Sequence, residues 1–294
     1  MNKRGFLTIV TIFVVLFVLF FGFSMAMLST TGRLGESDDA LVGVVEINGA
    51  IMSSKKTIKE LKSFVKREDV KAIVVRIDSP GGAVAPSQEM FDALKRAKAK
   101  KPLVVSMGST AASGGYYIAC GADTIFANPG SVTGSIGVIS QIFSVEELLG
   151  LAKINVHTLK TGPYKDSGSM VRPFTEQDRT YLQGLIDDIH DQFISDVATG
   201  RKLDKAQVRA VADGRVFTGR QALKLKLVDK MGSLQDAVEF VAKEAKIEGD
   251  PEVVYPPKKG FPLLGRFIET GVEHAVTQLK TSTGPSVEFR YTGQ

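Results

Sequence analysis

The chain has 294 residues, and its apolar fraction of 44% is typical of a globular protein with one large or two small domains. The formal net charge is +5 at pH 7, and the basic residues are spread out without an arginine-rich arm, which argues against nucleic-acid binding. A lone cysteine, Cys120, excludes an intrachain disulfide. The three histidines match no zinc motif, so we expect no metal or other cofactor.

The N-terminus carries a long uncharged apolar segment. Lys3 and Arg4 precede residues 6–28, which are nearly all apolar and, at 23 residues, long enough to cross a bilayer as a helix. The core of a secretory signal is usually shorter, although Ser24-Met25-Ala26 leaves cleavage open. Because positive charge stays on the cytoplasmic side, we expect residues 1–28 to be a cytoplasmic N-terminus and membrane anchor, with the remaining chain outside.

Strands and helices alternate after a short linker over residues 29–40. Apolar, β-branched runs predict strands, and amphipathic runs predict helices, in the following order. Strands are expected over 41–47, 71–77, 102–107, 124–127, 136–139 and 155–159, with helices over 57–66, 86–99 and 145–151 and directly after the third strand. Such alternation predicts a parallel sheet in an α/β domain.

From residue 175 onward the pattern becomes helical. Helices are predicted over 175–199, 204–212, 219–226 and 234–246, and the first three open with the capping-box pairs Thr175/Asp178, Asp204/Gln207 and Thr218/Gln221. Residues 250–294 contain several prolines and an amphipathic pattern over 263–279. We expect this tail to be a satellite of a core domain that spans residues 41–249.

Ser113 is the candidate nucleophile. It lies in the run Ala-Ala-Ser-Gly-Gly between an apolar strand and a second apolar segment. Small residues on both sides permit a sharp strand-to-helix turn that presents a hydroxyl group, and they also suit an ordinary buried helix start. A serine becomes nucleophilic only when a neighbouring base takes its proton.

Candidates for the base and for an oxyanion donor follow from local context. His157 and His190 are available, but His190 falls on an apolar-periodic helix, which favours packing. Lys165 lies in a Gly/Pro-bounded loop after a predicted strand, where it is either a solvated lysine or a base that must be uncharged to act. Ser79-Pro-Gly-Gly82 follows a strand and precedes a helix, so its amides suit either an oxyanion or a plain turn.

Five motifs occur in a fixed order along the chain. They are Asp-Ser-Pro-Gly-Gly at 78–82, Ser-Met-Gly-Ser-Thr-Ala-Ala-Ser-Gly-Gly-Tyr-Tyr at 106–117, Thr-Gly-Ser-Ile-Gly-Val at 133–138, Pro-Tyr-Lys-Asp at 163–166 and Ala-Asp-Gly-Arg-Val-Phe-Thr-Gly at 212–219. Over residues 41–247 the chain thereby resembles the signal peptide peptidase family SppA (protease IV), in its short single-copy form.

The resemblance implies a ClpP/crotonase-like α/β fold and a Ser/Lys dyad without histidine. It assigns Ser113 as nucleophile and Lys165 as general base, with Ser135 orienting the lysine. The backbone N–H groups of Gly82 and Gly114 would form the oxyanion hole. The tail after residue 249 lies outside the resemblance.

Further expectations about assembly and location follow from the same resemblance. It implies a homo-oligomeric ring in which the serine and lysine of one site can come from adjacent subunits. It also implies a single-pass endopeptidase of the bacterial inner membrane, with its catalytic domain on the extracytoplasmic side. Its substrates would be cleaved signal peptides and other extended, apolar peptides.

The sequence suggests three other functions. The SxxK matches at 53–56 and 63–66, with Lys-Thr-Gly at 160–162, mimic a penicillin-binding pattern, but no Ser-Asp-Asn follows them. An acyl-CoA enzyme could use the same scaffold and oxyanion turn, although a membrane anchor argues against it. A non-catalytic, membrane-anchored scaffold is the third interpretation, and the presence of both Ser113 and Lys165 argues against it.

Overall fold

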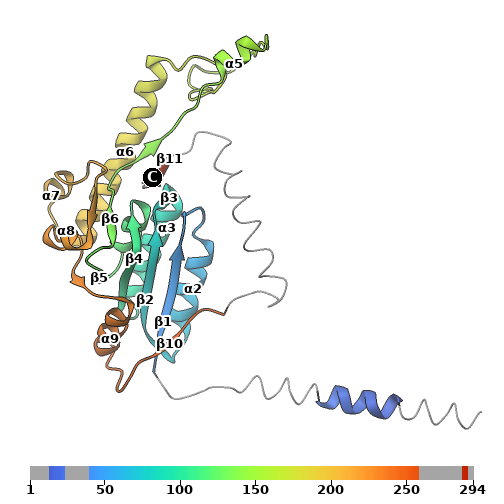
Figure 1. Ribbon diagram of the computed structural model, residues 1–294, viewed down its shortest axis with the longest axis vertical. Coiled ribbons are helices and arrows are strands. Elements are labelled where there is room, and N and C mark those ends of the chain that lie inside the picture. Colours follow the sequence, from blue (N-terminus) through green and yellow to red (C-terminus); the bar gives the residue numbers. More distant parts are fainter. Residues whose placement is uncertain (1–12, 24–39, 258–286, 291–294) are drawn as a thin grey trace, which may run out of the picture. The chain divides into compact units, whose positions relative to one another are not determined.

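The computed structural model describes residues 13–23, 40–257 and 287–290, which Figure 1 draws as ribbon. The chain divides into two compact units, residues 1–39 and 40–294. In the first unit residues 13–23 are helical, and the rest of the expected anchor at 6–28 lies outside the described residues. Within the described ranges, no helix reaches the length and apolarity that a membrane crossing requires.

A largely parallel sheet forms the centre of the second unit. Its main path runs β10-β1-β2-β4-β5-β9, while β6 pairs with the far end of β4 and with β8. These strands are β1 (Leu41–Asn48), β2 (Val70–Ser79), β4 (Leu103–Ala112), β5 (Thr124–Ala127), β6 (Val132–Gly134), β8 (Val216–Thr218), β9 (Lys230–Met231) and β10 (Glu252–Val254). Every pair along the main path is parallel, which confirms the predicted sheet.

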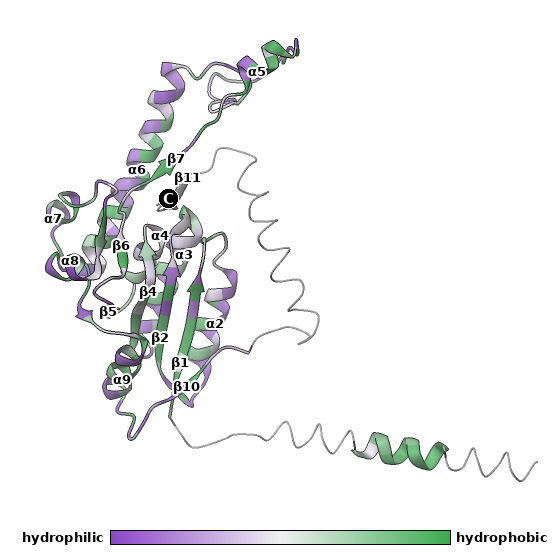
Figure 2. Cartoon of the chain, in the orientation of Figure 1, coloured by the Kyte–Doolittle hydropathy of each residue, from purple (hydrophilic) through white to green (hydrophobic). Residues whose placement is uncertain are grey.

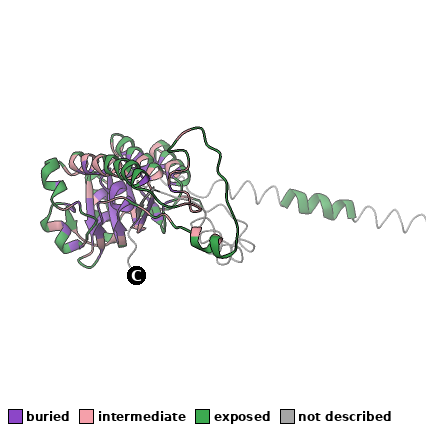
Figure 3. Ribbon diagram, turned by 90° about the horizontal axis from the view of Figure 1, so that it is seen from above, coloured by how far each residue is buried: buried purple, intermediate pink, exposed green. Residues whose placement is uncertain are grey.

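Helices cover both faces of this sheet, as the buried strands in Figure 3 show. The helices are α2 (Lys55–Lys66), α3 (Val84–Lys98), α4 (Gly114–Ala119), α6 (Glu176–Arg201), α7 (Lys205–Arg209), α8 (Gly219–Lys224) and α9 (Leu234–Glu244). Along β2, Ile73 and Val75 pack in the core shared with α2, α3, α4 and α6. The intervening residue Val74 packs in a smaller core with α9. Burial on both faces explains why the strands are nearly continuous apolar runs (Figure 2).

All three predicted capping boxes are present at the starts of α6, α7 and α8. A fourth capping box, which was not among the predicted ones, joins Ser233 and Asp236 at the start of α9. Each box gives side-chain partners to backbone N–H groups that a helix start leaves unpaired. Local side-chain spacing therefore located these helix starts correctly.

Three strand predictions need correction. The strand expected to end at residue 107 continues to Ala112 as β4. The strand expected over 136–139 is replaced by β6 and the short β7 (Ile139–Ser140). The strand expected over 155–159 has no regular structure, because this apolar segment is exposed and has no neighbouring strand to pair with.

Residues 141–175, which we call the arm, contain that exposed segment and the short helix α5 (Glu146–Leu151). In Figure 1 the arm extends from the end of α6 that is farther from the sheet. Its residues 151–161 are all exposed.

The tail, residues 250–294, contributes two strands rather than lying apart as a satellite. β10 pairs in parallel with β1 at the edge of the main sheet. β11 (Val287–Arg290) pairs with β3 (Gly81–Ala83) and β7 in a second, three-stranded sheet. The amphipathic pattern at 263–279 lies outside the described residues.

Candidate active site

Ser113 sits at the turn between β4 and α4 in a conformation that side-chain-bearing residues seldom adopt. Its φ is 53° and its ψ is −117°, so the backbone is strained there. Two hydrogen bonds hold it: the Ser113 N–H donates to the Gly134 carbonyl at 2.8 Å, and the Tyr117 N–H donates to the Ser113 carbonyl at 2.8 Å. The Ser113 hydroxyl is buried and has no hydrogen-bond partner. Because an unpartnered buried hydroxyl is costly, strain and burial together mark this residue as functional.

An irregularity in β4 places this turn at the end of the sheet. Ile77 pairs with Met107, but the next pair is Ser79 with Ala111, so β4 contains two extra residues there. The Asp78 carboxylate accepts a hydrogen bond from the Thr110 N–H at 3.0 Å, which fixes the irregular segment. The strand therefore continues past the predicted end and carries Ser113 beyond β2.

Gly82 and Gly114 meet beside Ser113 because neither has a side chain. A Cβ on Gly114 would lie 2.6 Å from Ser87 Oγ and 3.3 Å from the Gly82 nitrogen. A Cβ on Gly82 would lie 2.2 Å from the carbonyl oxygen of Ile51. The Gly114 N–H, at the first position of α4, has no acceptor within the helix. The two amides are thus close together beside Ser113, as an oxyanion hole requires.

Ser135 comes to the same end of the sheet through β6. Ala112 pairs with Gly134, so Ser113 and Ser135 each follow a paired position on adjacent strands. Ser135 also has a positive φ, 51°, and its N–H donates to the Arg215 carbonyl at 2.8 Å. Four of the five predicted site residues are therefore brought together.

Lys165, the fifth, is not joined to them within one chain. It lies on the arm, it is exposed, and its N–H donates to the Gly162 carbonyl at 3.3 Å. No hydrogen bond links it to the unpartnered Ser113 hydroxyl. The two histidines considered as bases also form no hydrogen bond with the Ser113 hydroxyl. His157 is exposed on the arm, and His190 lies on α6 with its Nε2 atom unpartnered.

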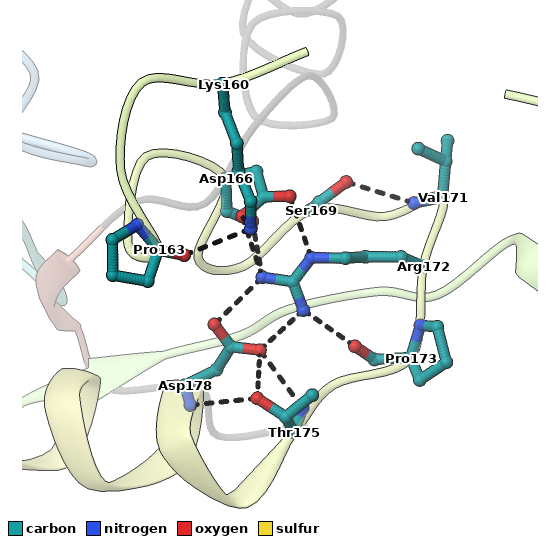
Figure 4. A network of polar contacts seen from close by, with 9 residues as sticks. All are labelled: Lys160, Pro163, Asp166, Ser169, Val171, Arg172, Pro173, Thr175 and Asp178. Carbon is teal, nitrogen blue, oxygen red and sulfur yellow. Dashed lines mark hydrogen bonds and ion pairs between the residues drawn. The ribbon is translucent and has the colours of Figure 1, made fainter. Parts of the chain in front are cut away.

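A network of ion pairs shapes the loop that carries Lys165 (Figure 4). Arg172 donates two hydrogen bonds to the carboxylate of Asp166, both at 3.0 Å, and two to that of Asp178, at 2.6 and 2.9 Å. Lys160 Nζ adds a hydrogen bond to Asp166 at 2.6 Å. In the sequence, Asp166 stands out only as part of the motif at 163–166, and nothing there marks Arg172. Residues 160–178 are thereby tied together around Lys165 and to the start of α6.

These hydrogen bonds keep both carboxylates ionised. Donation from Arg172, then from Lys160, lowers the pKa of Asp166 to about 2. Donation from Arg172 and Thr175 lowers the pKa of Asp178 well below its ordinary value. A free aspartate has a pKa of about 3.9, so the stability from Asp166 is fully present above that pH and is lost as the pH falls toward about 2.

Two family models match the chain. The model for peptidase family S49 matches residues 95–248, which include Ser113, Ser135 and Lys165. The Clp protease model matches residues 43–133, which cover the first half of the sheet and the Ser113 turn. The fold is accordingly a ClpP-like α/β fold, as expected from the sequence.

The chain is also similar to individual proteins of known sequence or structure. A putative protease of Synechocystis is 45% identical over 252 residues, covering 84% of this chain and 89% of that protein. A putative signal peptide peptidase SppA of Enterococcus faecium is 36% identical, covering 67% of this chain and 58% of that protein. A solved structure of a ClpP1 mutant from Listeria monocytogenes is 17% identical, with a TM-score of 0.44 over 66% of this chain and 92% of that one. The chain belongs to peptidase family S49 and is an SppA-like serine peptidase.

Proposed function

We propose that the chain is a membrane-anchored serine endopeptidase in which Ser113 attacks the peptide carbonyl and Lys165 is the general base. The observation that carries the proposal is the buried, unpartnered Ser113 hydroxyl at a strained turn. Two closely approaching amides, those of Gly82 and Gly114, lie beside it. A hydroxyl held without a partner is available to a base and a substrate that arrive from elsewhere.

The chemistry follows from these positions. Uncharged Lys165 accepts the proton of Ser113 as the Ser113 oxygen bonds to the peptide carbonyl carbon, and the amides of Gly82 and Gly114 donate to the resulting oxyanion. The protonated lysine then donates its proton to the leaving amine, and the peptide bond breaks to give an acyl-enzyme. Water, deprotonated by the same lysine, hydrolyses the ester. Ser135, beside the Ser113 turn, would orient the lysine by hydrogen bonding.

The lysine of each site comes from a neighbouring copy in a homo-oligomeric ring. Two features of a single chain support this: Lys165 is exposed, and the arm around it carries exposed apolar side chains. They include Phe143, Leu148, Leu151, Ile154, Val156 and Leu159. Docking the arm on an adjacent copy would bury this apolar surface, and burial favours the uncharged amine that a base needs.

Location and substrate follow from the apolar N-terminus and the relatives. The uncharged segment 6–28 supports a single anchor in the bacterial inner membrane, with residues 41–294 on the extracytoplasmic side. The Enterococcus faecium relative carries the name of a signal peptide peptidase. We infer that the substrates are cleaved signal peptides and other extended apolar peptides. The family match favours this chemistry over an acyl-CoA enzyme or a non-catalytic scaffold.

Complementation between two inactive variants tests the dyad and its sharing together. Ser113→Ala and Lys165→Ala should each abolish hydrolysis of an apolar fluorogenic peptide, while Lys224→Ala, a change of an exposed lysine on α8, should not. If each site joins two copies, random co-assembly of equal amounts of the two inactive variants should restore about a quarter of the sites. Activity in either purified variant alone would refute the dyad. A mixture that stays inactive although mixed oligomers form would refute sharing between copies.

A further inference from the structure

Two basic segments of the main domain meet at the edge of the sheet where strands β1, β2 and β4 begin (Figure 1). One segment, residues 62–71, contains the end of α2 and the start of β2, and the other, residues 95–101, contains the end of α3 and the turn before β4. The Lys101 ammonium joins them, because it donates to three backbone carbonyls of the first segment at 2.5 to 2.7 Å. We call the two segments together the basic corner.

The basic corner concentrates the positive charge of the chain. Residues 62–71 contain four basic and two acidic side chains, and residues 95–101 contain five basic and no acidic ones, which gives a net charge of +7. The whole chain carries +5, so all its other residues together carry a net charge of −2. Burial, and then the positive charge of nearby Lys71, lowers the pKa of Lys101. Like charges are therefore crowded at this corner.

Most of these cations have no acidic partner. Ion pairs at the corner are Arg67–Asp69, Lys95–Asp92 and Lys98–Asp123. The side chains that are exposed and form no ion pair with any residue that the structure describes are Lys62, Lys66, Lys71, Arg96 and Lys100. A cation in the last turn of a helix interacts favourably with the helix dipole, which accounts for Lys66 and Arg96. It does not account for Lys71 or Lys100, which lie outside the helices.

The N-terminal segment of the chain enters the main domain at the same corner. Leu41, the first residue of β1, pairs with Val70, and its N–H donates to the carbonyl of Asp69 at 2.8 Å. Only residues 29–40 separate Leu41 from the apolar segment that we propose as a membrane anchor. A linker of this length spans at most about 40 Å when fully extended. An anchored chain therefore keeps the basic corner near the lipid headgroups.

We propose that the basic corner docks on the anionic phospholipid headgroups of the membrane that holds the anchor. This inference rests on the membrane anchor of the proposed function, which brings the two surfaces together. Clusters of lysine and arginine close to an anchor are attracted to anionic lipid over about 8 Å at physiological salt. Docking orients the main domain, because the corner and Ser113 lie at opposite ends of β4, which spans about 30 Å. The Ser113 turn is then held away from the bilayer surface.

Energy transfer to the bilayer measures docking. The full chain carries a thiol-reactive dye at Ser63→Cys, an exposed position in the basic corner, and is reconstituted in vesicles that contain a headgroup-labelled acceptor lipid. Buried Cys120 does not react with the dye. Transfer should be stronger with about 30% phosphatidylglycerol than with phosphatidylcholine alone, and about 0.5 M NaCl should remove the difference by screening. A dye at Ser53→Cys, about 15 Å away beyond the other end of α2, should respond less.

Neutralising exposed charges tests the basic corner itself. The corner variant combines Lys71→Gln, Arg96→Gln and Lys100→Gln with the dye at residue 63. The matched control loses the same charge at the other end of α2, through Lys55→Gln, Lys56→Gln and Lys59→Gln. Each cation near an anionic surface favours docking about fivefold, so the ratio of docked to undocked chains should fall about 100-fold in the corner variant and stay nearly unchanged in the control. Unchanged transfer in the corner variant would overturn the inference.

Flotation of the full chain with vesicles separates this inference from the proposed anchor. An inserted anchor should make the chain float with neutral vesicles even at high salt. A chain that floats only with anionic vesicles, and no longer does so as the corner variant, would support the basic corner and refute the anchor. A chain that floats with neutral vesicles, but whose residue 63 shows equal transfer in neutral and anionic ones, would support the anchor and refute docking of the corner. Failure to float with either kind of vesicle would refute both.

Discussion

Around Ser113 the chain is buried and tightly packed, whereas around Lys165 it is exposed and held mainly by charges. In the first region, glycines approach neighbouring atoms so closely that a single added carbon would collide with Ser87 or Ile51. In the second, residues 151–161 are all exposed, and Arg172 binds two carboxylates that fix the loop. One half of the proposed dyad thus lies in a rigid core and the other on a projecting arm.

A single chain therefore completes the surroundings of the proposed nucleophile but not those of the proposed base. The core holds the Ser113 turn and the amides of Gly82 and Gly114 by hydrogen bonds and close packing within the chain. The arm leaves large apolar side chains in water, which soluble surfaces seldom do over a contiguous segment. We therefore interpret the arm as a surface shaped to be covered by another copy.

The largest expected effect comes from filling the space at Gly114. Gly114→Ala places a carbon 2.6 Å from Ser87 Oγ and 3.3 Å from the Gly82 nitrogen, so the two amides must separate. Losing one oxyanion donor lowers kcat about 100- to 1,000-fold. Gly150→Ala on the arm, where a Cβ meets nothing within 4 Å, is the control and should keep full activity. Peptide hydrolysis is measured alongside thermal unfolding, and a folded Gly114→Ala enzyme with normal kcat would contradict the proposed oxyanion hole.

A smaller effect is expected from charging the apolar arm. Leu159 is 100% exposed in the single chain, and Leu159→Glu should weaken each contact between copies, since a buried leucine contributes about 2 kcal/mol, or roughly thirtyfold in affinity. Molecular mass by light scattering and peptidase activity should fall together. Leu225→Glu, a change of an exposed leucine on the main domain, should alter neither. An intact, active oligomer of Leu159→Glu would show that this part of the arm is not the contact.

The smallest effect is expected from the ion pairs that position the arm. Arg172→Gln leaves Asp166 and Asp178 without their shared cation, so trypsin should cleave at Lys160 and Lys165 several-fold faster and kcat/KM should fall modestly. Arg179→Gln, which removes an exposed pair with Glu176, is the control and should change little.

Acid provides a second measurement of the same network. Because the pKa of Asp166 is lowered to about 2, residues 160–178 of the unmodified chain should resist pepsin near pH 4 and become sensitive only as the pH falls toward about 2. Arg172→Gln should already be cleaved near pH 4. Equal pepsin sensitivity of the two proteins across this range would show that the ion pairs do not hold the arm.

The sequence by itself predicted the buried parts of the fold and of the site. Continuous apolar runs located strands such as residues 71–77, and side-chain spacing located the starts of α6, α7 and α8. The motifs at 78–82, 106–117 and 133–138 follow or end strands of one parallel sheet, and such strand ends meet at one edge. The resemblance to the SppA family had assigned Ser113, Gly82, Gly114 and Ser135 to one site, and this shared edge is the physical reason that the four residues meet.

Only the tertiary structure decided which segments find a partner. Residues 155–159 have the composition of a strand but stay irregular, whereas residues 287–290, in a tail expected to lie apart, pair with β3 and β7. The separation of Lys165 from the unpartnered Ser113 hydroxyl was anticipated only through the family resemblance, because no residue pattern of a single chain reports it. Periodicity and motifs report what a segment's own neighbours favour, but strand pairing and side-chain contact depend on residues far away in the chain.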